Sequence, residues 1–164
     1  MERERILHPI PPVFDERSEI LILGSFPSVK SREAAFFYGH PQNRFWRVLA
    51  ALYDEPLPQN TEEKRALLLR RHIAVWDVIA SCSIVGSSDS SIRDAAANDL
   101  RPILKVSGLT RIYVNGKTAE KLYRNFIEPT LGIEAVCLPS TSPANAAYSL
   151  DRLVEAWSVI KVHE

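Results

Sequence analysis

The sequence is poor in cysteine, with only Cys82 and Cys137 among 164 residues. An iron–sulfur cluster needs four thiolates, so this chain cannot supply the ligands of one. Both cysteines lie in apolar surroundings, which favours reduced and partly buried thiols. No grouping of His, Cys and carboxylates has the spacing of a zinc site either. We therefore expect a protein that holds neither a metal nor another cofactor.

The chain also lacks long hydrophobic runs. None of its apolar segments approaches the roughly 20 residues needed to cross a bilayer. Its charged start, Met1-Glu2-Arg3-Glu4-Arg5, has no apolar stretch of the kind found in signal peptides. We therefore expect a cytoplasmic protein that does not bind a membrane.

An excess of charge of one sign is missing as well. Lys plus Arg equals Asp plus Glu, 20 against 20, so the net charge gives no sign of a polyanionic partner, which a basic surface would attract. The distribution of charge matters more than its sum. Four basic residues fall close together in the sequence, which favours a local basic face on a neutral protein: Lys30, Arg32, Arg44 and Arg47.

Strand-like and helical segments alternate along the chain, whose length fits one domain over residues 1–164. Ile20–Leu23 is apolar throughout, as expected for a parallel strand covered on both faces. Further strands are expected at 73–79, 111–116 and 134–138. Helices are expected at 45–52, 61–71, 92–106 and 117–126, and a last helix should run from the loop at 139–143 to about 162. Residues 8–12 should be extended, and residues 81–91 should form a polar loop. This alternation predicts an α/β protein with three layers, α/β/α, around a central four-stranded, mostly parallel twisted sheet.

The most informative segment runs from Ile20 to Trp46. Its apolar strand breaks at Gly24-Ser25-Phe26-Pro27-Ser28, a turn that exposes backbone amides at the carboxyl edge of the sheet, where open α/β folds bind ligands. Tyr38-Gly39-His40-Pro41-Gln42-Asn43-Arg44-Phe45-Trp46 follows. An aromatic ring, an imidazole, a carboxamide and a guanidinium are thus available for stacking, hydrogen bonding and phosphate contact.

The motifs GSFPS at 24–28, YGHPQNRFW at 38–46 and LPSTSPANA at 138–146 resemble the uracil-DNA glycosylase superfamily. Within it, the chain is most similar to the hypoxanthine (deoxyinosine) DNA glycosylases and the mismatch-specific uracil/thymine DNA glycosylases. The similarity covers most of the chain, with three motifs in the right order and at compatible spacing. It implies an enzyme that flips a deaminated base out of DNA and hydrolyses its N-glycosidic bond, with hypoxanthine the first expected substrate and uracil the second.

The resemblance assigns base binding to the first turn and the aromatic residue before the His-Pro-x-Asn segment: Gly24, Ser25, Phe26, Pro27 and Tyr38. In the mismatch-specific relatives that aromatic residue stacks on the base, and such stacking contributes about 1–3 kcal/mol. A core position for Tyr38 remains open, with Phe36 and Phe37 as alternative stacking partners.

The resemblance also gives the catalytic candidates, Asn43 and His40. Many relatives have an Asn or Asp where this chain has Phe26, so the usual group that activates water is missing. In the hypoxanthine-directed family, which lacks it too, catalysis is assigned to the Asn that is Asn43 here. A carboxamide can orient water without being a strong base, although Asn43 could instead cap the following helix and His40 could be a structural histidine. Asp89 is an alternative catalytic group, with capping of a helix after it as the more ordinary role.

Contacts with DNA are expected from a larger group of residues. In the superfamily the third motif enters the minor groove, where Pro143 or Ala144 could fill the vacated stack, and a plain loop is the alternative. Arg44 and Arg47 could touch phosphate or simply be solvated. The predicted DNA-binding residues are Ser28, Lys30, Arg44, Ser140, Thr141, Ser142, Pro143 and Asn145.

No lysine within the motifs has a setting that would lower its pKa for Schiff-base chemistry, so we expect a monofunctional enzyme that leaves an abasic site. Its expected partner is DNA containing deaminated bases, bound by a monomer that lies at the nucleoid when bound. Two other interpretations stay open. One is a catalytically silent nucleic-acid or nucleotide-binding domain, and the other is a small-molecule hydrolase using Ser25 or Ser28, although the Gly-x-Ser-x-Gly elbow is absent.

Overall fold

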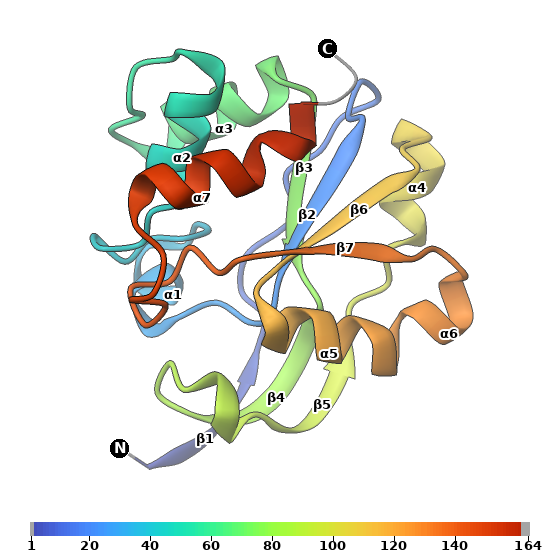
Figure 1. Ribbon diagram of the computed structural model, residues 1–164. Helices are drawn as coiled ribbons and strands as arrows, with labels where there is room; N and C mark the ends of the chain where they lie inside the picture. Colours follow the sequence, from blue (N-terminus) through green and yellow to red (C-terminus); the bar gives the residue numbers. More distant parts are fainter. Residues whose placement is uncertain (1, 162–164) are drawn as a thin grey trace.

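The computed structural model describes residues 2–161, and a four-stranded parallel sheet forms its centre (Figure 1). Its strands are β2 (Ile20–Gly24), β3 (Ile73–Asp77), β6 (Arg111–Asn115) and β7 (Ala135–Leu138). They lie in the order β3-β2-β6-β7, and every neighbouring pair is parallel. The predicted central sheet is confirmed.

Helices cover both faces of this sheet, because the strands are apolar on both sides. Along β2, Ile20 and Ile22 pack in one buried cluster with α2 (Phe45–Tyr53), α3 (Thr61–Arg70) and α7 (Leu150–Trp157). Leu21 and Leu23 point the other way and pack with α4 (Arg101–Ser107) and α5 (Lys117–Phe126). This period of two is that of a strand, and it produces the expected three layers.

A second, smaller sheet corrects two predictions for the middle of the chain. It joins β1 (Arg3–Leu7), β4 (Ile79–Val85) and β5 (Arg93–Ala97) in antiparallel fashion, in the order β1-β4-β5. The first part of the predicted polar loop at 81–91, up to Val85, is therefore strand, and the predicted helix at 92–106 begins only at Arg101. Local polarity suggested a loop, but pairing with the distant N-terminal strand determines the structure of this segment.

The remaining elements are short. α1 (Val29–Ala34) is capped by Ser28, whose hydroxyl accepts a hydrogen bond from the backbone N–H of Ser31. The other short elements are α6 (Glu128–Leu131) and the 3₁₀ turns η1 (Asp89–Ser91) and η2 (Ser158–Lys161). Asn60, rather than Thr61, caps α3, and the last α-helix begins at Leu150, later than the loop suggested.

The segment between β1 and β2 lies along β3, an edge strand of the central sheet. The backbones of Val13 and Val75 exchange hydrogen bonds of 3.0 and 2.9 Å, and the N–H of His8 donates to the carbonyl of Ala80 at 2.7 Å. The proline-rich segment at 8–12 is extended, as expected, and it brings His8 to the carboxyl end of β3. Within residues 2–161, no helix has both the length and the apolar character that a bilayer span requires.

Candidate active site

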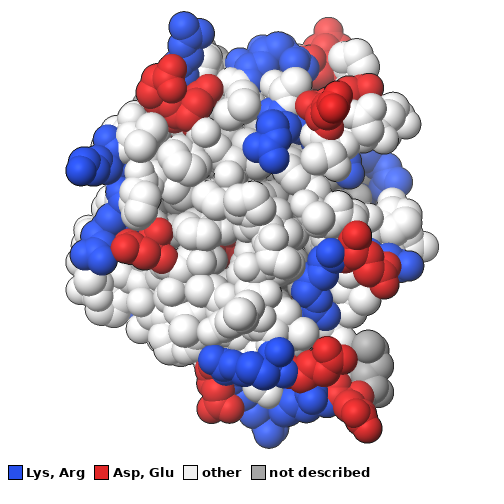
Figure 2. All heavy atoms as spheres, turned by 180° about the vertical axis from the view of Figure 1, so that it is seen from behind, with Lys and Arg blue, Asp and Glu red and all other residues white. Residues whose placement is uncertain are grey.

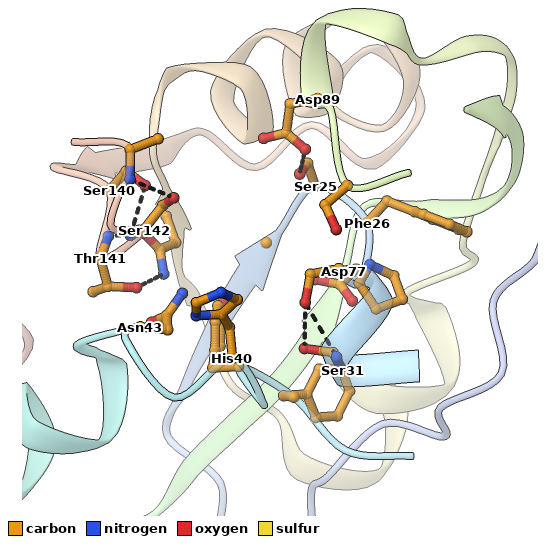
Figure 3. Close-up of a pocket in the computed structure, with 18 of the residues that line it drawn as sticks. Ser25, Phe26, Ser31, His40, Asn43, Asp77, Asp89, Ser140, Thr141 and Ser142 are labelled. Atoms are coloured by element: carbon orange, nitrogen blue, oxygen red, sulfur yellow. Dashed lines mark hydrogen bonds between the residues drawn. The ribbon is translucent and has the colours of Figure 1, made fainter. Parts of the chain in front are cut away.

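A pocket of about 350 Å³ opens at the carboxyl edge of the parallel sheet, where Gly24, Asp77 and Asn115 end β2, β3 and β6. The three sequence motifs meet there with the ends of β3 and β6 and the segment that follows β4 (Figure 3). Its lining comprises Gly24, Ser25, Phe26, Pro27, Ser28, Ser31, Phe37, Tyr38, His40, Asn43, Asp77, Ser87, Asp89, Asn115, Ser140, Thr141, Ser142, Pro143 and Ala144.

Most of the predicted catalytic, base-binding and DNA-binding residues contribute to this lining, but three do not. Lys30 lies on the exposed surface of α1, where its ammonium is 3.6 Å from the carboxylate of Glu33. Arg44 and Asn145 turn into the protein and hold the third motif in place. The structure therefore brings together all the predicted base-binding and catalytic positions, and separates Lys30, Arg44 and Asn145 from them.

Tyr38 both packs against the core and lines the pocket. Its ring stacks on Phe45 with centroids 4.0 Å apart and planes at 21°. Burial raises the pKa of the Tyr38 phenol, and the negative charge of Asp77 adds to this effect, outweighing the nearby Asn115 carboxamide, which favours ionisation. The hydroxyl thus stays protonated. Phe36 belongs to the core, whereas Phe37 reaches the pocket wall from the core.

Phe26 lines the pocket without filling it. The residue is only 7% exposed, and the edge of its ring meets His8 with centroids 5.8 Å apart. The guanidinium of Arg32 lies over the same ring at 5.8 Å. An apolar residue at this position of the motif is therefore accommodated by packing.

Asn43 has one end engaged with helix α2 and the other available to the pocket. Its Oδ1 accepts a hydrogen bond of 2.9 Å from the backbone N–H of Phe45, which satisfies a free donor of the first helical turn. Arg44, and not Asn43, occupies the cap position itself. Among the described residues, none hydrogen-bonds Nδ2 of Asn43, and both Asn43 and His40 line the pocket (Figure 3). Helix stabilisation and a role in the pocket are thus compatible.

His40 presents a defined donor. Its Nδ1 accepts a hydrogen bond of 3.1 Å from the backbone N–H of Gln42, a role that requires a lone pair on this nitrogen. The ring proton therefore lies on Nε2. His40 can donate a hydrogen bond from Nε2 to an oxygen or nitrogen in the pocket.

The third motif is fixed by buried hydrogen bonds. The side chain of Asn115, at the end of β6, donates to Oγ1 of Thr141 at 3.0 Å and accepts from its backbone N–H at 3.1 Å. The Arg44 guanidinium donates to the carbonyls of Ser142 and Asn145, both at 3.0 Å, and to that of Tyr148. These bonds leave Pro143 and Ala144 exposed at the mouth of the pocket.

Asp77 is the main residue that the sequence analysis missed. It ends β3 and is only 4% exposed, and its Oδ2 lies 2.8 Å from Nε2 of His8. Treating 73–79 as one continuous strand concealed it. A useful signal was available, because Asp77 is the one charged side chain in the run Ile73–Ile79, at the edge where ligands bind. Ser31, Ser87 and Asn115 were missed for similar reasons.

Asp89 also faces the pocket, and the expectation that it caps a following helix is wrong, because the strand β5 follows it. Its carboxylate accepts a hydrogen bond of 2.9 Å from the hydroxyl of Ser25. Although much of the residue is exposed, burial of the carboxyl group raises its pKa, the charge of Asp77 raises it further, and the Ser25 hydrogen bond opposes this shift. Two carboxyl groups thus share one pocket.

The charges on the surface are mixed in sign. Figure 2 shows a face whose middle is almost free of charged side chains, with Lys and Arg side chains spread around its margins beside Asp and Glu. Within residues 2–161, no group of three or more His, Cys, Asp or Glu side chains is arranged to hold a metal ion.

Comparison with known proteins identifies the family. The model of the uracil DNA glycosylase superfamily matches residues 11–161. The chain is 39% identical over 158 residues to a hypoxanthine DNA glycosylase of Methanosarcina acetivorans, covering 93% of this chain and 96% of that protein. It is 37% identical over 142 residues to one of Methanosarcina barkeri, covering 82% and 85%.

A solved structure shares the fold. The solution NMR structure of a candidate uracil DNA glycosylase from M. acetivorans is 36% identical, with a TM-score of 0.79, covering 94% of this chain and 95% of that one. The chain belongs to the uracil DNA glycosylase superfamily. The family resemblance and the fold class expected from the motifs are confirmed, and membership makes a serine hydrolase an untenable alternative.

Proposed function

We propose that this protein is a monofunctional DNA glycosylase that hydrolyses the N-glycosidic bond of a deaminated base, with hypoxanthine preferred and uracil second. The observation that carries the proposal is the pocket in which Tyr38, His40 and Asn43 meet the Gly24–Ser28 turn and the Ser140–Ala144 loop. Membership of the superfamily and the names of the two Methanosarcina relatives support the same activity.

The base is held by stacking and by contacts to its edge. Tyr38 supplies an aromatic surface supported from behind by Phe45, and the backbone amides of the 24–28 turn are well placed to bind base or phosphate oxygens. A base can enter this pocket only after it has left the duplex. Pro143 and Ala144, exposed at the mouth of the pocket, are suited to fill the gap that it leaves.

Bond cleavage needs charge stabilisation and an aligned water. Glycosidic cleavage develops oxocarbenium-like charge on the sugar and negative charge on the departing base. Nε2–H of His40 can donate to that base, a contribution of about 3 kcal/mol where donors are preorganised. Asn43 can hold the water through its free Nδ2 and the second lone pair of Oδ1. Asp89 is the alternative group for this role.

DNA phosphates and the strand around the base are bound by the hydroxyls of Ser28, Ser140 and Ser142, with Lys30 and Arg47 outside the pocket. Thr141, predicted to contact DNA, is instead fully buried, and its hydroxyl is bound by Asn115. No lysine is among the residues that line the described pocket. Without an amine near the sugar, Schiff-base formation and strand cleavage are not expected. The product is therefore an intact strand with an abasic site.

The proposal is tested with duplexes that contain hypoxanthine or uracil. The protein should release the base and leave a strand that breaks only after alkali treatment. Release of neither base would disprove the function, and strand breakage without alkali would disprove the monofunctional mechanism.

Asn43 provides the matched test of mechanism. Asn43→Ala should lower kcat/KM at least 100-fold and the free energy of unfolding by about 1 kcal/mol, because it also removes the bond to Phe45. Asn43→Ser retains an acceptor for that bond but lacks the amide, so it should lose activity and keep stability. Wild-type activity in both variants would show that Asn43 has no catalytic role. A catalytically silent binding domain would have no activity to lose.

We also propose that the protein acts as a monomer in the cytoplasm, at the nucleoid when bound to DNA. Light scattering after gel filtration should give a mass of 18.5 kDa. A dimer mass would contradict this.

A further inference from the structure

The small antiparallel sheet has an outer face that the roles proposed above leave unused. Its inner face is apolar, because Ile6 of β1 and Cys82 and Ile84 of β4 pack in a buried cluster. Successive side chains of a strand point to opposite faces of its sheet. Arg5, next to Ile6, therefore belongs to the outer face, and so does Arg3, two residues earlier on the same strand.

Pairing across the sheet adds a third arginine to this outer face. Ser83 of β4 lies opposite Arg5 of β1 and also opposite Arg93 of β5. Directly paired residues of antiparallel strands have their side chains on the same face, whereas Glu4, between Arg3 and Arg5, points to the other one. The outer face thus carries Arg3, Arg5 and Arg93, which we call the arginine face. All three residues are exposed.

The arginine face is not neutralised from within the protein. Among the described residues, no carboxylate forms an ion pair with any of its three arginines. Nη1 of Arg3 donates to the carbonyl of Ser91 at 2.7 Å, and Nη1 of Arg5 donates to the carbonyl of Asp94 at 2.6 Å. These bonds hold two guanidiniums on the sheet, while Nε of each has no hydrogen-bond partner in the described part of the chain. The side chain of Arg93 forms no hydrogen bond there at all.

The arginine face adjoins the pocket. The segment after β4 contributes Ser87 and Asp89 to the pocket lining and then reaches Ser91, to which Arg3 is bound. Figure 1 shows the start of β1 beside this segment, on the side of the molecule where α1 and the loop before α7 also lie. A DNA strand that leaves the pocket on this side therefore meets the arginine face.

We propose that the arginine face binds phosphates of the DNA that flanks the flipped nucleotide. This inference rests on the proposed function, and it extends the DNA contact beyond the loops around the pocket. Guanidinium donors bind phosphate oxygens in a bidentate fashion. Arg3 and Arg5 stand two strand residues apart, about 6.7 Å, which matches two phosphate steps of about 3.4 Å along one DNA strand. Because bonds to the sheet already hold both guanidiniums, less side-chain entropy is lost on binding.

Arg93 provides the cleanest test, since its replacement breaks no hydrogen bond or ion pair with the described residues. The probe is a duplex that contains a tetrahydrofuran residue, an abasic-site mimic that cannot be cleaved, and its affinity is measured over a range of salt concentrations. Arg93→Ala should reduce the slope of log affinity against log salt by about 1 and weaken binding about fivefold to tenfold near ~0.1 M salt. Arg93→Lys retains the charge and should keep most of the slope.

Arg17→Ala is the matched control, because it removes the same charge elsewhere on the surface. Arg17 is exposed, has no ion pair among the described residues, and lies three residues before β2, at the amino edge of the parallel sheet. This variant should leave the slope and the affinity unchanged. If Arg93→Ala loses no more slope than Arg17→Ala, the inference is overturned, whether or not the protein releases bases.

A second measurement locates the contact on the DNA. Neutral methylphosphonate linkages replace the phosphates of the duplex one at a time. Where the lost phosphate contacts Arg93, wild type should bind about tenfold more weakly, whereas Arg93→Ala, which already lacks the contact, should lose less than about twofold. Equal losses in both proteins at every flanking position would contradict the contact.

Arg3→Gln separates DNA binding by Arg3 from support of the sheet. Glutamine keeps an N–H for the carbonyl of Ser91 but carries no charge, so the salt slope should fall by about 1 with the melting temperature unchanged. A lower melting temperature with an unchanged slope would make Arg3 purely structural and remove it from the interface. A wild-type protein that releases neither hypoxanthine nor uracil would overturn the proposed function, and this inference with it.

Discussion

Gly24 is the residue on which the geometry of the pocket depends most directly. A methyl group there would lie 2.5 Å from Oδ1 of Asp77 and 3.1 Å from the hydroxyl of Tyr38. The first distance is shorter than any normal contact, so one of the two side chains must move. The glycine is needed for space alone, since it leaves room for the carboxylate and the phenol to meet at the end of β2.

We therefore expect Gly24→Ala to lower kcat/KM on hypoxanthine at least tenfold. Gly132→Ala is the matched control, because a Cβ there meets nothing within 4 Å but the backbone has φ of +74°. It should cost about 1 kcal/mol of stability and leave kcat/KM unchanged. Full activity of Gly24→Ala, measured in the same assay, would show that the pocket tolerates the displaced side chains.

At the scale of secondary-structure elements, Arg44 joins the start of α2 to the loop before α7. Its guanidinium binds carbonyl oxygens of Ser142, Asn145 and Tyr148, and its backbone N–H donates to the carbonyl of Thr141 at 3.0 Å. A charge used in this way supports the loop from inside the protein. This structural role of Arg44 differs from the phosphate contact that its place in the second motif suggested.

Arg44→Lys should therefore lower the free energy of unfolding by about 2 kcal/mol, because one ammonium cannot reproduce the fork of donors. In this variant the slope of log DNA affinity against log salt concentration should stay unchanged. Lys30→Ala is the complementary variant, with stability unchanged and the slope of log affinity against log salt reduced by about 1 if Lys30 contacts a phosphate. A reduced slope in Arg44→Lys would show that Arg44 contacts DNA after all.

Glu55, just beyond the end of α2, links that helix to the end of α3. A hydrogen bond from Arg70, assisted by another from Arg71, lowers the pKa of Glu55 to about 2. Because the folded pKa is below the ordinary value of 4.5, the stabilisation is complete above that pH and disappears as the pH falls toward 2. Glu55→Gln should thus melt at a lower temperature than wild type at pH 7, and the difference should shrink with acid. A constant difference across this range, in thermal melts followed by circular dichroism, would contradict the ion pair.

For the molecule as a whole, the two sheets and both helical layers are expected to unfold as one domain, residues 1–164. Trp76 packs against the buried clusters on both faces of the parallel sheet, and β4 follows β3 after a single residue. Urea unfolding measured by tryptophan fluorescence and by far-ultraviolet circular dichroism should therefore give coincident transitions. Two separate midpoints would indicate that the small sheet unfolds independently.

The basic residues that were expected to form a local basic face are bound to other groups of the protein, which qualifies that expectation. Lys30 is paired with Glu33, and the Arg32 guanidinium binds the carbonyls of Pro27 and Gly86. Arg47 is bound to the carbonyl of Pro41. We therefore expect contacts through hydroxyls and backbone amides to contribute more to DNA binding than the total of Lys and Arg suggests.

The sequence by itself determined the parallel sheet and the location of the pocket, because both depend on local patterns. Ile20–Leu23 is apolar on both faces, and the turn at 24–28 follows directly. The motif at 38–46 then predicted Tyr38, His40 and Asn43 as pocket residues. Only the tertiary structure decided the pairing of β1 with β4, the structural use of Arg44, and the pairing of His8 with Asp77. These depend on contacts between residues 69 or more positions apart, and the pattern of neighbouring residues does not encode which distant partner a side chain meets.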